Sequence, residues 1–364
     1  MAVKSDRTAR KRSSVTERAL VVAVETRALR PSIDTELDEF EALAEAAGAK
    51  ILDRVVQRRD TVDPATLVGS GKAVELAERA KELGATLLLV LNDLRPRQRK
   101  NLEKTIPVPI VDRTMLILDV FARHARSREG KLQVELAQLR YRQSNLIGIG
   151  ADLSRLGGGI GTRGPGETKL EVDRRRIGER IAALNGMLDD VRRQRAVRRS
   201  APHREPLVAL VGYTNVGKSS LLNALARSQA FVADQPFATL DPTTRRVYLA
   251  PGEYVRIADT VGFITDLPKD LVNAFRATLE ELGEADLMLH VLDASNPQWR
   301  RQQHAVDEIL HDLQLDKVPR LLVFNKCDLS APDAPNELPG TFCVSAKTGE
   351  GLGALRAALI ECLK

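Results

Sequence analysis

Cysteines and long apolar runs are scarce in this sequence, and each shortage excludes a class of protein. The three cysteines, Cys327, Cys343 and Cys362, have neither CxxC spacing nor histidine partners, which excludes a disulfide framework and a zinc site. The longest apolar stretches, 19–24 and 86–91, are interrupted by charge well short of the length of a membrane span or a signal peptide. We therefore expect a cytoplasmic protein with incidental thiols and no membrane span.

Aromatic residues are also few, at 4% of 364 residues, while hydrophobic residues of all kinds reach 43%. These values are typical of a globular protein with aliphatic cores, and the length exceeds that of one average domain. Residues 1–205 hold 40 Lys+Arg against 29 Asp+Glu, a net charge of +11, and residues 206–364 hold 15 against 20, a net charge of −5. A basic half joined to a slightly acidic half predicts that the first half meets a polyanion, and nucleic acid is the expected one.

The first third of the chain predicts a tail and a small domain. Residues 1–18 are basic and lack hydrophobic periodicity, so we expect a disordered tail. Between residues 19 and 112 short apolar runs alternate with helical patterns, which predicts a small parallel α/β subdomain. Its expected strands lie near 20–24, 51–56, 86–91 and 108–111, and its expected helices near 33–47, 96–104 and after Gly71.

Residues 113–200 predict a long antiparallel helical hairpin. The first helix is expected from 113 to about 141 and the second from 167 to about 199, with one apolar face formed by Ile177, Ile181, Leu184, Leu188 and Val191. The connecting segment 148–166 holds eight glycines among nineteen residues, too many for a packed core, and is expected to be a mobile tip. A polar stretch with two prolines, 201–206, predicts a linker to a second domain at 207–364.

A phosphate-binding pattern follows the apolar run at 207–211. The stretch from Gly212 to Ser219 matches GxxxxGK[ST] and precedes an expected helix at 221–225, which is the strand–loop–helix context that the pattern requires. In such a loop, backbone N–H groups bind phosphate oxygens, Lys218 reaches the β- and γ-phosphates, and the Ser219 hydroxyl binds Mg²⁺. The residues predicted to bind the nucleotide here are Gly212, Tyr213, Thr214, Asn215, Val216, Gly217, Lys218, Ser219 and Ser220.

A second polar segment follows the strand expected at 254–258. Asp259, at the strand end, is expected to hold Mg²⁺ through water, and the Gly262 amide to meet the γ-phosphate. In the loop 237–244, a threonine is expected to close over the γ-phosphate and donate an oxygen to Mg²⁺; Thr239 is our choice, and Thr243 is the second. The segment adds Asp259, Thr260, Val261 and Gly262 to the predicted nucleotide contacts.

The base of the nucleotide is predicted by Asn325-Lys326-Cys327-Asp328, which directly follows an expected strand at 321–324. The Asp328 carboxylate accepts hydrogen bonds only, so it suits guanine N1–H and the exocyclic amine, which adenine does not offer. Asn325 is placed to bridge the base and the phosphate loop. After a further expected strand at 341–344 come Ser345, Ala346 and Lys347, and the Ala346 amide is expected to donate to guanine O6. The predicted ligands are therefore GTP and GDP.

The catalytic machinery departs from the pattern of Ras-like enzymes. Phe263 stands where those enzymes carry the glutamine that orients the attacking water, and a phenyl ring cannot hydrogen-bond that water. We therefore expect a low intrinsic rate of GTP hydrolysis and dependence on electrostatics or a partner. The Asn215 side chain is a candidate ligand for a K⁺ ion beside the phosphates. The predicted catalytic residues are Lys218, Asn215, Thr239 and Gly262, and the predicted metal ligands are Ser219, Thr239 and Asp259.

Together with these motifs, three upstream stretches give the sequence a family resemblance. They are Val68-Gly69-Ser70-Gly71-Lys72, the residues 126–139 with the sequence RSREGKLQVELAQL, and the glycine-rich run from Gly157 to Glu167. With the nucleotide motifs, they resemble the HflX family of ribosome-associated GTPases over roughly residues 20–364. The resemblance implies a protein that binds the large ribosomal subunit with its N-terminal module, directs the glycine-rich tip toward ribosomal RNA and separates stalled or idle ribosomes.

The fold expected from these patterns is α/β. A small parallel α/β subdomain and a helical hairpin precede a Ras-like P-loop G domain with a doubly wound, mostly parallel sheet. Arginines on the second long helix and in the glycine-rich tip are the candidate RNA contacts, and the chain is expected to act as a monomer. These candidates are Arg155, Arg163, Arg174, Arg175 and Arg176.

Four other interpretations are weaker. The run 159–164 matches GxGxxG, but it follows no strand, so a dinucleotide enzyme is disfavoured. ATP binding by the N-terminal module through 69–72 or the tip would make an RNA-remodelling ATPase, but that phosphate loop is incomplete. A tRNA-modifying GTPase resembles this chain only in the G domain, which such enzymes insert within a helical domain. A pure binding module would bind GTP without turnover.

Overall fold

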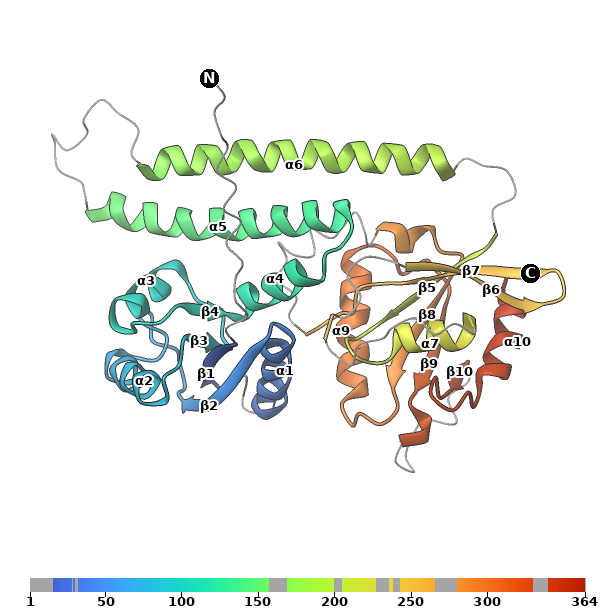
Figure 1. Cartoon of the computed structure of the whole chain (residues 1–364), viewed down its shortest axis with the longest axis horizontal. Helices are drawn as coiled ribbons and strands as arrows, with labels where there is room; N and C mark the ends of the chain where they lie inside the picture. The colour runs from blue at the N-terminus through green and yellow to red at the C-terminus, as the bar shows by residue number, and fades with distance from the viewer. Residues whose placement is uncertain are drawn as a thin grey trace, which may run out of the picture. The chain divides into compact units, whose positions relative to one another are not determined.

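The computed structural model describes residues 16–27, 29, 32–156, 169–199, 205–226, 236–237, 243–265, 280–329 and 340–363. The chain divides into two compact units, Met1–Arg113 and Thr114–Lys364, which are described separately below (Figure 1). Within the described ranges, no helix combines the length and the hydropathy needed to cross a bilayer.

The first unit is built on a four-stranded parallel sheet in the order β2-β1-β3-β4. The central strand β1 is buried from residue 19 to residue 25, as expected for a parallel strand with helices on both faces. The prediction of a small parallel α/β domain is confirmed. Its elements are β1 (Glu17–Glu25), α1 (Ile33–Ala46), β2 (Ala49–Arg58), α2 (Ser70–Leu83), β3 (Leu87–Val90), α3 (Pro96–Thr105) and β4 (Ile110–Asp112).

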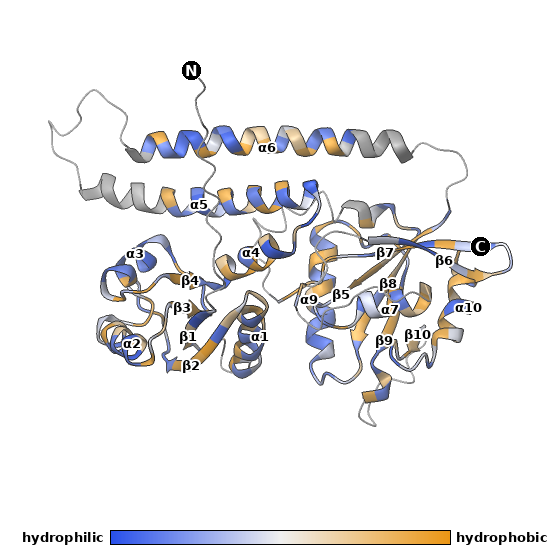
Figure 2. Cartoon of the chain, in the orientation of Figure 1, coloured by the Kyte–Doolittle hydropathy of each residue, from blue (hydrophilic) through white to orange (hydrophobic). Residues whose placement is uncertain are grey.

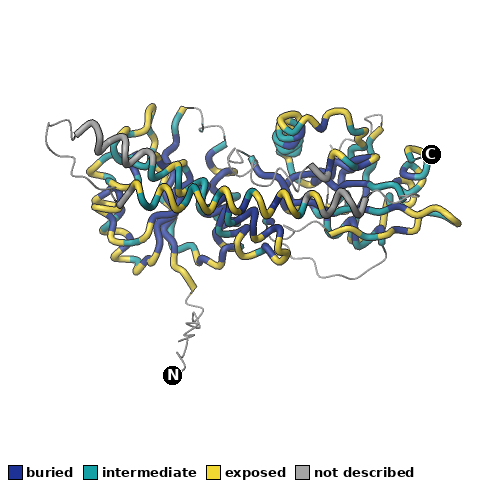
Figure 3. Tube along the Cα trace, turned by 90° about the horizontal axis from the view of Figure 1, so that it is seen from above, coloured by how far each residue is buried: buried dark blue, intermediate teal, exposed yellow. Residues whose placement is uncertain are grey.

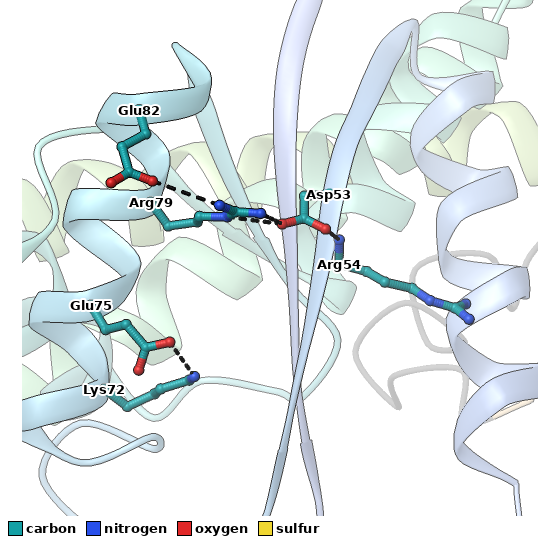
Figure 4. A network of polar contacts seen from close by, with 6 residues as sticks. All are labelled: Asp53, Arg54, Lys72, Glu75, Arg79 and Glu82. Atoms are coloured by element: carbon teal, nitrogen blue, oxygen red, sulfur yellow. Dashed lines mark hydrogen bonds and ion pairs between the residues drawn. The ribbon is translucent and has the colours of Figure 1, made fainter.

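Strand β2 lies at one edge of this sheet and is tied to α2 by charged side chains (Figure 4). Asp53 accepts two hydrogen bonds from the Arg79 guanidinium, at 2.9 and 3.0 Å. On the same helix, Lys72 pairs with Glu75 at 2.6 Å. Lys72 is the lysine of the incomplete phosphate loop considered above, and here it serves a helix-surface ion pair.

Three helices follow: α4 (Arg113–His124), α5 (Arg128–Leu156) and α6 (Lys169–Arg199). The expectation of one helix from 113 to 141 is wrong, because the chain leaves the helix at 125–127 and restarts. The Ser127 hydroxyl accepts a hydrogen bond from the Gly130 amide at 2.9 Å, the contact by which a serine begins a helix.

Helix α5 also runs further than predicted, to Leu156. The first nine residues of the predicted tip, 148–156, are therefore helical. They contain only two of the eight glycines, Gly148 and Gly150, and a helix tolerates isolated glycines at about 1 kcal/mol each. The glycine-dense remainder, 157–166, lies outside the described residues.

Helices α5 and α6 lie side by side as an antiparallel pair (Figure 1). Between residues 171 and 191, the residues of α6 range from exposed to buried (Figure 3). Leu132 and Leu136 of α5 pack against Leu184 and Leu188 of α6, with Ile181 beside them. These α6 leucines belong to the apolar face predicted from the sequence. At the exposed margin Arg180 donates two hydrogen bonds to Glu135, at 2.7 and 2.9 Å, across the pair.

The remainder of the second unit is a six-stranded sheet in the order β10-β9-β8-β5-β7-β6. All neighbouring strands are parallel except β6, which runs antiparallel to β7. The two central strands, β5 and β8, are largely apolar (Figure 2). The predicted doubly wound, mostly parallel sheet is confirmed. Its elements are β5 (Leu207–Gly212), α7 (Lys218–Ala226), β6 (Thr243–Ala250), β7 (Glu253–Asp259), η1 (Glu280–Glu284), β8 (Leu287–Asp293), α9 (Trp299–Asp312), β9 (Arg320–Asn325), η2 (Cys327–Leu329), β10 (Thr341–Cys343) and α10 (Leu352–Cys362).

Candidate functional site

The loop between β5 and α7 has a backbone that only glycine fits at two positions. Gly212 and Gly217 have positive φ angles of 152° and 89°. A Cβ on Gly212 would collide with the Val291 carbonyl oxygen, and one on Gly217 with the Asn325 side chain. The close approach of the loop to β8 and β9 therefore requires both glycines, and it brings the start of α7 to the carboxyl edge of the sheet.

Lys218 lies buried at the start of α7. Its ammonium donates hydrogen bonds to the carbonyl oxygens of Gly212, at 3.0 Å, and Tyr213, at 2.7 Å. Burial lowers the pKa of Lys218 to about 8, an effect that the nearby Asp259 carboxylate partly opposes. The lysine is held inside the loop with its charge directed at the loop's own carbonyl groups.

The end of β7 meets the same loop. The Ser219 hydroxyl donates to Asp259 Oδ2 at 2.5 Å, and Thr260 anchors the following segment by donating to the Leu210 carbonyl at 2.6 Å. A hydroxyl and a carboxylate that converge in this way are hard oxygen donors of the kind that Mg²⁺ prefers. The residues present therefore fit a magnesium ion.

The segment after β7 pairs with the phosphate loop through its backbone. Thr214 N–H donates to the Phe263 carbonyl at 2.7 Å, and Phe263 N–H donates to the Gly212 carbonyl at 3.1 Å. A Cβ on Gly262 would lie 2.9 Å from the Thr214 Cα and 3.2 Å from the Lys218 Nζ, so this position also requires glycine. The Phe263 ring is 2% exposed and offers no polar group.

Asn325, at the end of β9, links the phosphate loop to the segment that follows β10. Its Nδ2 donates to the Val216 carbonyl at 2.9 Å, and its Oδ1 accepts from the Ala346 amide at 3.0 Å. The next residue, Lys326, has a positive φ of 65° and donates from Nζ to the Asn215 carbonyl at 3.0 Å. The residues predicted to recognise the base are thus connected to the phosphate loop by side-chain hydrogen bonds.

Asp328 is held by the segment after β10. The Ser345 hydroxyl donates to Asp328 Oδ1 at 2.7 Å and accepts from the Thr348 amide at 3.0 Å. Ser345 is completely buried, so this contact fixes the orientation of the Asp328 carboxylate. Lys347, the last residue of the predicted motif, is exposed.

Two contributions were missing from the sequence interpretation. Asp293 accepts an ion pair from Lys326 Nζ at 2.8 Å and so fixes the lysine of the base motif. Its signal was available, because it is a carboxylate directly after an apolar run. The Tyr213 hydroxyl accepts from the Thr265 amide at 2.8 Å, and no sequence pattern indicated this contact.

Several predicted residues lie elsewhere. Thr239 and Arg163 fall outside the described residues, and Arg155 lies in α5 at a position where no side chain is described. Thr243 is not in a loop as expected but opens β6, where it pairs with Asp259 in register. The triplet 174–176 is exposed on α6.

Comparison with known proteins gives matches over most of the chain. Residues 34–122 match the family model described as GTP-binding GTPase N-terminal, 124–201 that described as GTP-binding GTPase Middle Region, and 207–326 that described as 50S ribosome-binding GTPase. The GTPase HflX of Lacrimispora saccharolytica is 48% identical over 348 residues, which are 94% of this chain and 82% of that protein. The chain belongs to the HflX family of GTPases.

Two further comparisons agree with this family and fold. The Escherichia coli GTPase HflX is 45% identical over 336 residues, covering 90% of this chain and 79% of that protein. A solved structure described as "crystal structure of SsGBP and GDP complex" has a TM-score of 0.53 at 22% identity, over 95% of this chain and 98% of its own, and it supports the fold. This HflX chain is therefore a GTP hydrolase, as the sequence predicted.

Proposed function

We propose that this HflX GTPase binds the large ribosomal subunit through its basic N-terminal part and couples GTP binding and hydrolysis to ribosome splitting or rescue. The observation that carries the proposal is the match of residues 207–326 to a ribosome-binding GTPase model in a chain that is an HflX protein over nearly its whole length. The net charge of +11 on residues 1–205 supports an RNA-rich partner. For this role we also propose a cytoplasmic location. We propose that the protein acts as a monomer.

The domain organisation proposed for this role follows the sequence. Residues 1–18 form a basic tail, 19–112 an α/β subdomain, 113–200 the hairpin with its tip, 201–206 a linker and 207–364 the G domain. The hairpin carries the RNA contacts, and Arg174, Arg175 and Arg176 are its exposed candidates in the described part. Of these, Arg175 forms a 3.8 Å ion pair with Glu179 on the exposed surface of the helix.

At the nucleotide site, we assign guanine recognition to Asp328, with Asn325 and Ala346 in support. The backbone of the loop from Gly212 and the Lys218 ammonium bind the phosphates. Ser219, Asp259 and Thr239 would hold the Mg²⁺ ion, which supplies positive charge where negative charge develops on the phosphate oxygens.

Hydrolysis is proposed to be slow without a partner. The apolar Phe263 ring is buried and cannot orient a water molecule, so the ribosome must complete the site. Asn215 lies exposed in the phosphate loop with a positive φ of 60°, a position from which its side chain could help to hold K⁺. GTP turnover should be at least about tenfold faster in KCl than in NaCl of equal ionic strength, and Asn215→Ala should abolish the difference. Equal rates in the two salts would remove the cation role.

The ribosome proposal is tested by sedimenting the full chain through sucrose with purified large subunits. We expect co-sedimentation with a non-hydrolysable GTP analogue and less with GDP. Replacing all three arginines at 174–176 with glutamine should weaken co-sedimentation without altering GTP binding. The proposal would be contradicted if the amount of protein that co-sediments were the same with GTP analogue and with GDP. It would also be contradicted if the arginine substitutions left that amount unchanged.

A further inference from the structure

The β6–β7 hairpin has one face that the nucleotide site does not use. Val247, Val255 and Ile257 point into the core and are buried. The alternate residues face the other way, and in the antiparallel register Arg246 lies opposite Arg256 and Tyr248 opposite Tyr254. This outer face of the hairpin, the 246/248/254/256 face, therefore presents one pair of arginines and one pair of tyrosines.

The two rings are accessible. Tyr248 is 49% exposed and Tyr254 is 38% exposed, with their centroids 5.5 Å apart and their planes at 65°. The Arg246 guanidinium lies over the Tyr254 ring, 3.8 Å from its centroid. The whole chain has only four tyrosines, so two of them at one exposed position is an unusual concentration of aromatic surface.

The charge of this face differs from that of its domain. Residues 206–364 carry a net charge of −5, with 15 Lys+Arg and 20 Asp+Glu, yet two arginines stand opposite each other here. Arg246 is partly neutralised by Glu205, whose carboxylate is 2.6 Å away. Arg256 is half-buried, and its Nε has no hydrogen-bond partner within the described part of the chain.

Stability of the hairpin alone does not account for the arrangement. A tyrosine pair and a cation–π contact each stabilise a hairpin only modestly. Like charges directly opposite each other act against that gain. A face that keeps two cations beside two partly exposed rings matches a ligand with both negative charge and flat apolar surfaces. Unpaired RNA has both, in its phosphates and its bases.

We propose that the 246/248/254/256 face is a platform for unpaired RNA, on which bases stack against Tyr248 and Tyr254 while the arginines bind the flanking phosphates. The platform adds a second RNA contact, on the G domain, to the one proposed for the hairpin of α5 and α6. It does not depend on that contact, and it binds RNA outside the ribosome as well.

The test measures binding of the full chain to a fluorescent single-stranded oligouridine by anisotropy. Tyr248→Leu with Tyr254→Leu keeps the face apolar but removes the rings, and Tyr248→Phe with Tyr254→Phe is the matched control that keeps them. The leucine variant should bind at least about tenfold more weakly, because each stacked base contributes about 1–3 kcal/mol. The phenylalanine variant should bind within about twofold of the parent, since both keep a ring of similar stacking capacity.

The same oligonucleotide annealed into a duplex should bind all three proteins equally, because its bases are not free to stack. GTP turnover of the three proteins should be the same, which shows that the G domain is folded. Repeating the series in a chain whose arginines at 174–176 are glutamine separates this proposal from the ribosome proposal. The leucine substitutions should weaken oligouridine binding in that chain by the same factor.

Equal binding of the leucine variant and the parent would overturn the platform. So would an equal loss in the leucine and phenylalanine variants. A third contrary outcome is a leucine variant that binds RNA normally but sediments poorly with ribosomal subunits, because it would assign the face to a protein contact.

Discussion

Replacing His290 tests how a buried, unpaired polar side chain affects the free energy of unfolding of the G domain. It lies in the fully buried strand β8 with an exposed fraction of 0%. Neither imidazole nitrogen has a hydrogen-bond partner in the described part of the chain, and Asp307 is 3.8 Å from Nδ1, too far for a hydrogen bond. Burial lowers the pKa of His290 to about 4, although the Asp307 carboxylate acts in the opposite direction.

A folded-state pKa below that of the unfolded chain makes the domain sensitive to acid. Above about pH 7.5 the histidine is almost entirely uncharged in both states and contributes little pH dependence. As the pH falls below about 6.5, the unfolded chain takes up the proton first, so folding loses free energy until the pH reaches the folded pKa. With a shift from 6.5 to about 4, the domain should lose about 2 kcal/mol between about pH 7.5 and about pH 5 through this group alone.

The perturbation is His290→Leu, which fills a similar volume and removes the buried polar atoms. We expect the variant to be at least as stable as the parent at neutral pH, because an unpaired buried polar group costs about 1–3 kcal/mol. At about pH 5 the advantage of the variant should increase by about 2 kcal/mol.

The assay is urea unfolding followed by the fluorescence of Trp299. This is the only tryptophan in the chain, and its ring packs edge-on against Phe324 of β9 at 5.1 Å, so it reports on the G domain rather than on the first unit. His304→Gln is the matched control, since it removes an imidazole that lies exposed on the surface of α9. Parallel loss of stability with acid in the parent and in His290→Leu would refute the reasoning.

Three further predictions concern the nucleotide site and the thiols. Asp328→Asn should weaken GTP binding by about a hundredfold or more and improve binding of xanthosine triphosphate, measured by nucleotide titration, because the amide donates where the carboxylate accepted; unchanged preference would contradict the assignment. Gly217→Ala should weaken GTP binding by about tenfold or more, because Gly217 has a φ of 89° and a Cβ there would collide with the Asn325 side chain. Gly178→Ala on α6 is the control, and it should leave GTP binding unchanged because the space around Gly178 is open. Iodoacetamide should label exposed Cys362 faster than Cys327, whose pKa is raised to about 12 by burial and by the neighbouring Cys343; mass spectrometry of the labelled peptides checks the order.

The architecture and the family could be predicted because their signals are local. A parallel strand buried on both faces, such as β8, is a continuous apolar run. The phosphate loop and the Asn325–Asp328 motif are short segments whose chemistry is fixed by a few atoms. The apolar face of α6 was predicted from the 3.6-residue spacing of its apolar residues, and Leu184 and Leu188 are buried as expected.

What could not be predicted depends on contacts distant in sequence or on the exact ends of elements. The break before α5 depends on one serine hydroxyl at Ser127, and serines at such positions are common. The start of β6 was interpreted as a loop because Thr243 is polar, and its pairing with Asp259 is visible only once the sheet forms. Asp293 could have been singled out as a carboxylate after an apolar run, but its contact with Lys326 could not, because it requires β8 and β9 to be neighbours.

Strand β2 has a consequence for how copies of this chain behave at high concentration. It is ten residues long and lies at the edge of its sheet, so its outer backbone groups could template a strand from another molecule. The register slips at Leu52, which has no partner on β1, and such a bulge twists the edge away from the flat geometry that strand addition needs. A second copy approaching in parallel would also bring Lys50, Arg54 and Arg58, all exposed, against the same cations of its neighbour. Irregular pairing and repulsion between like charges together disfavour aggregation through this edge.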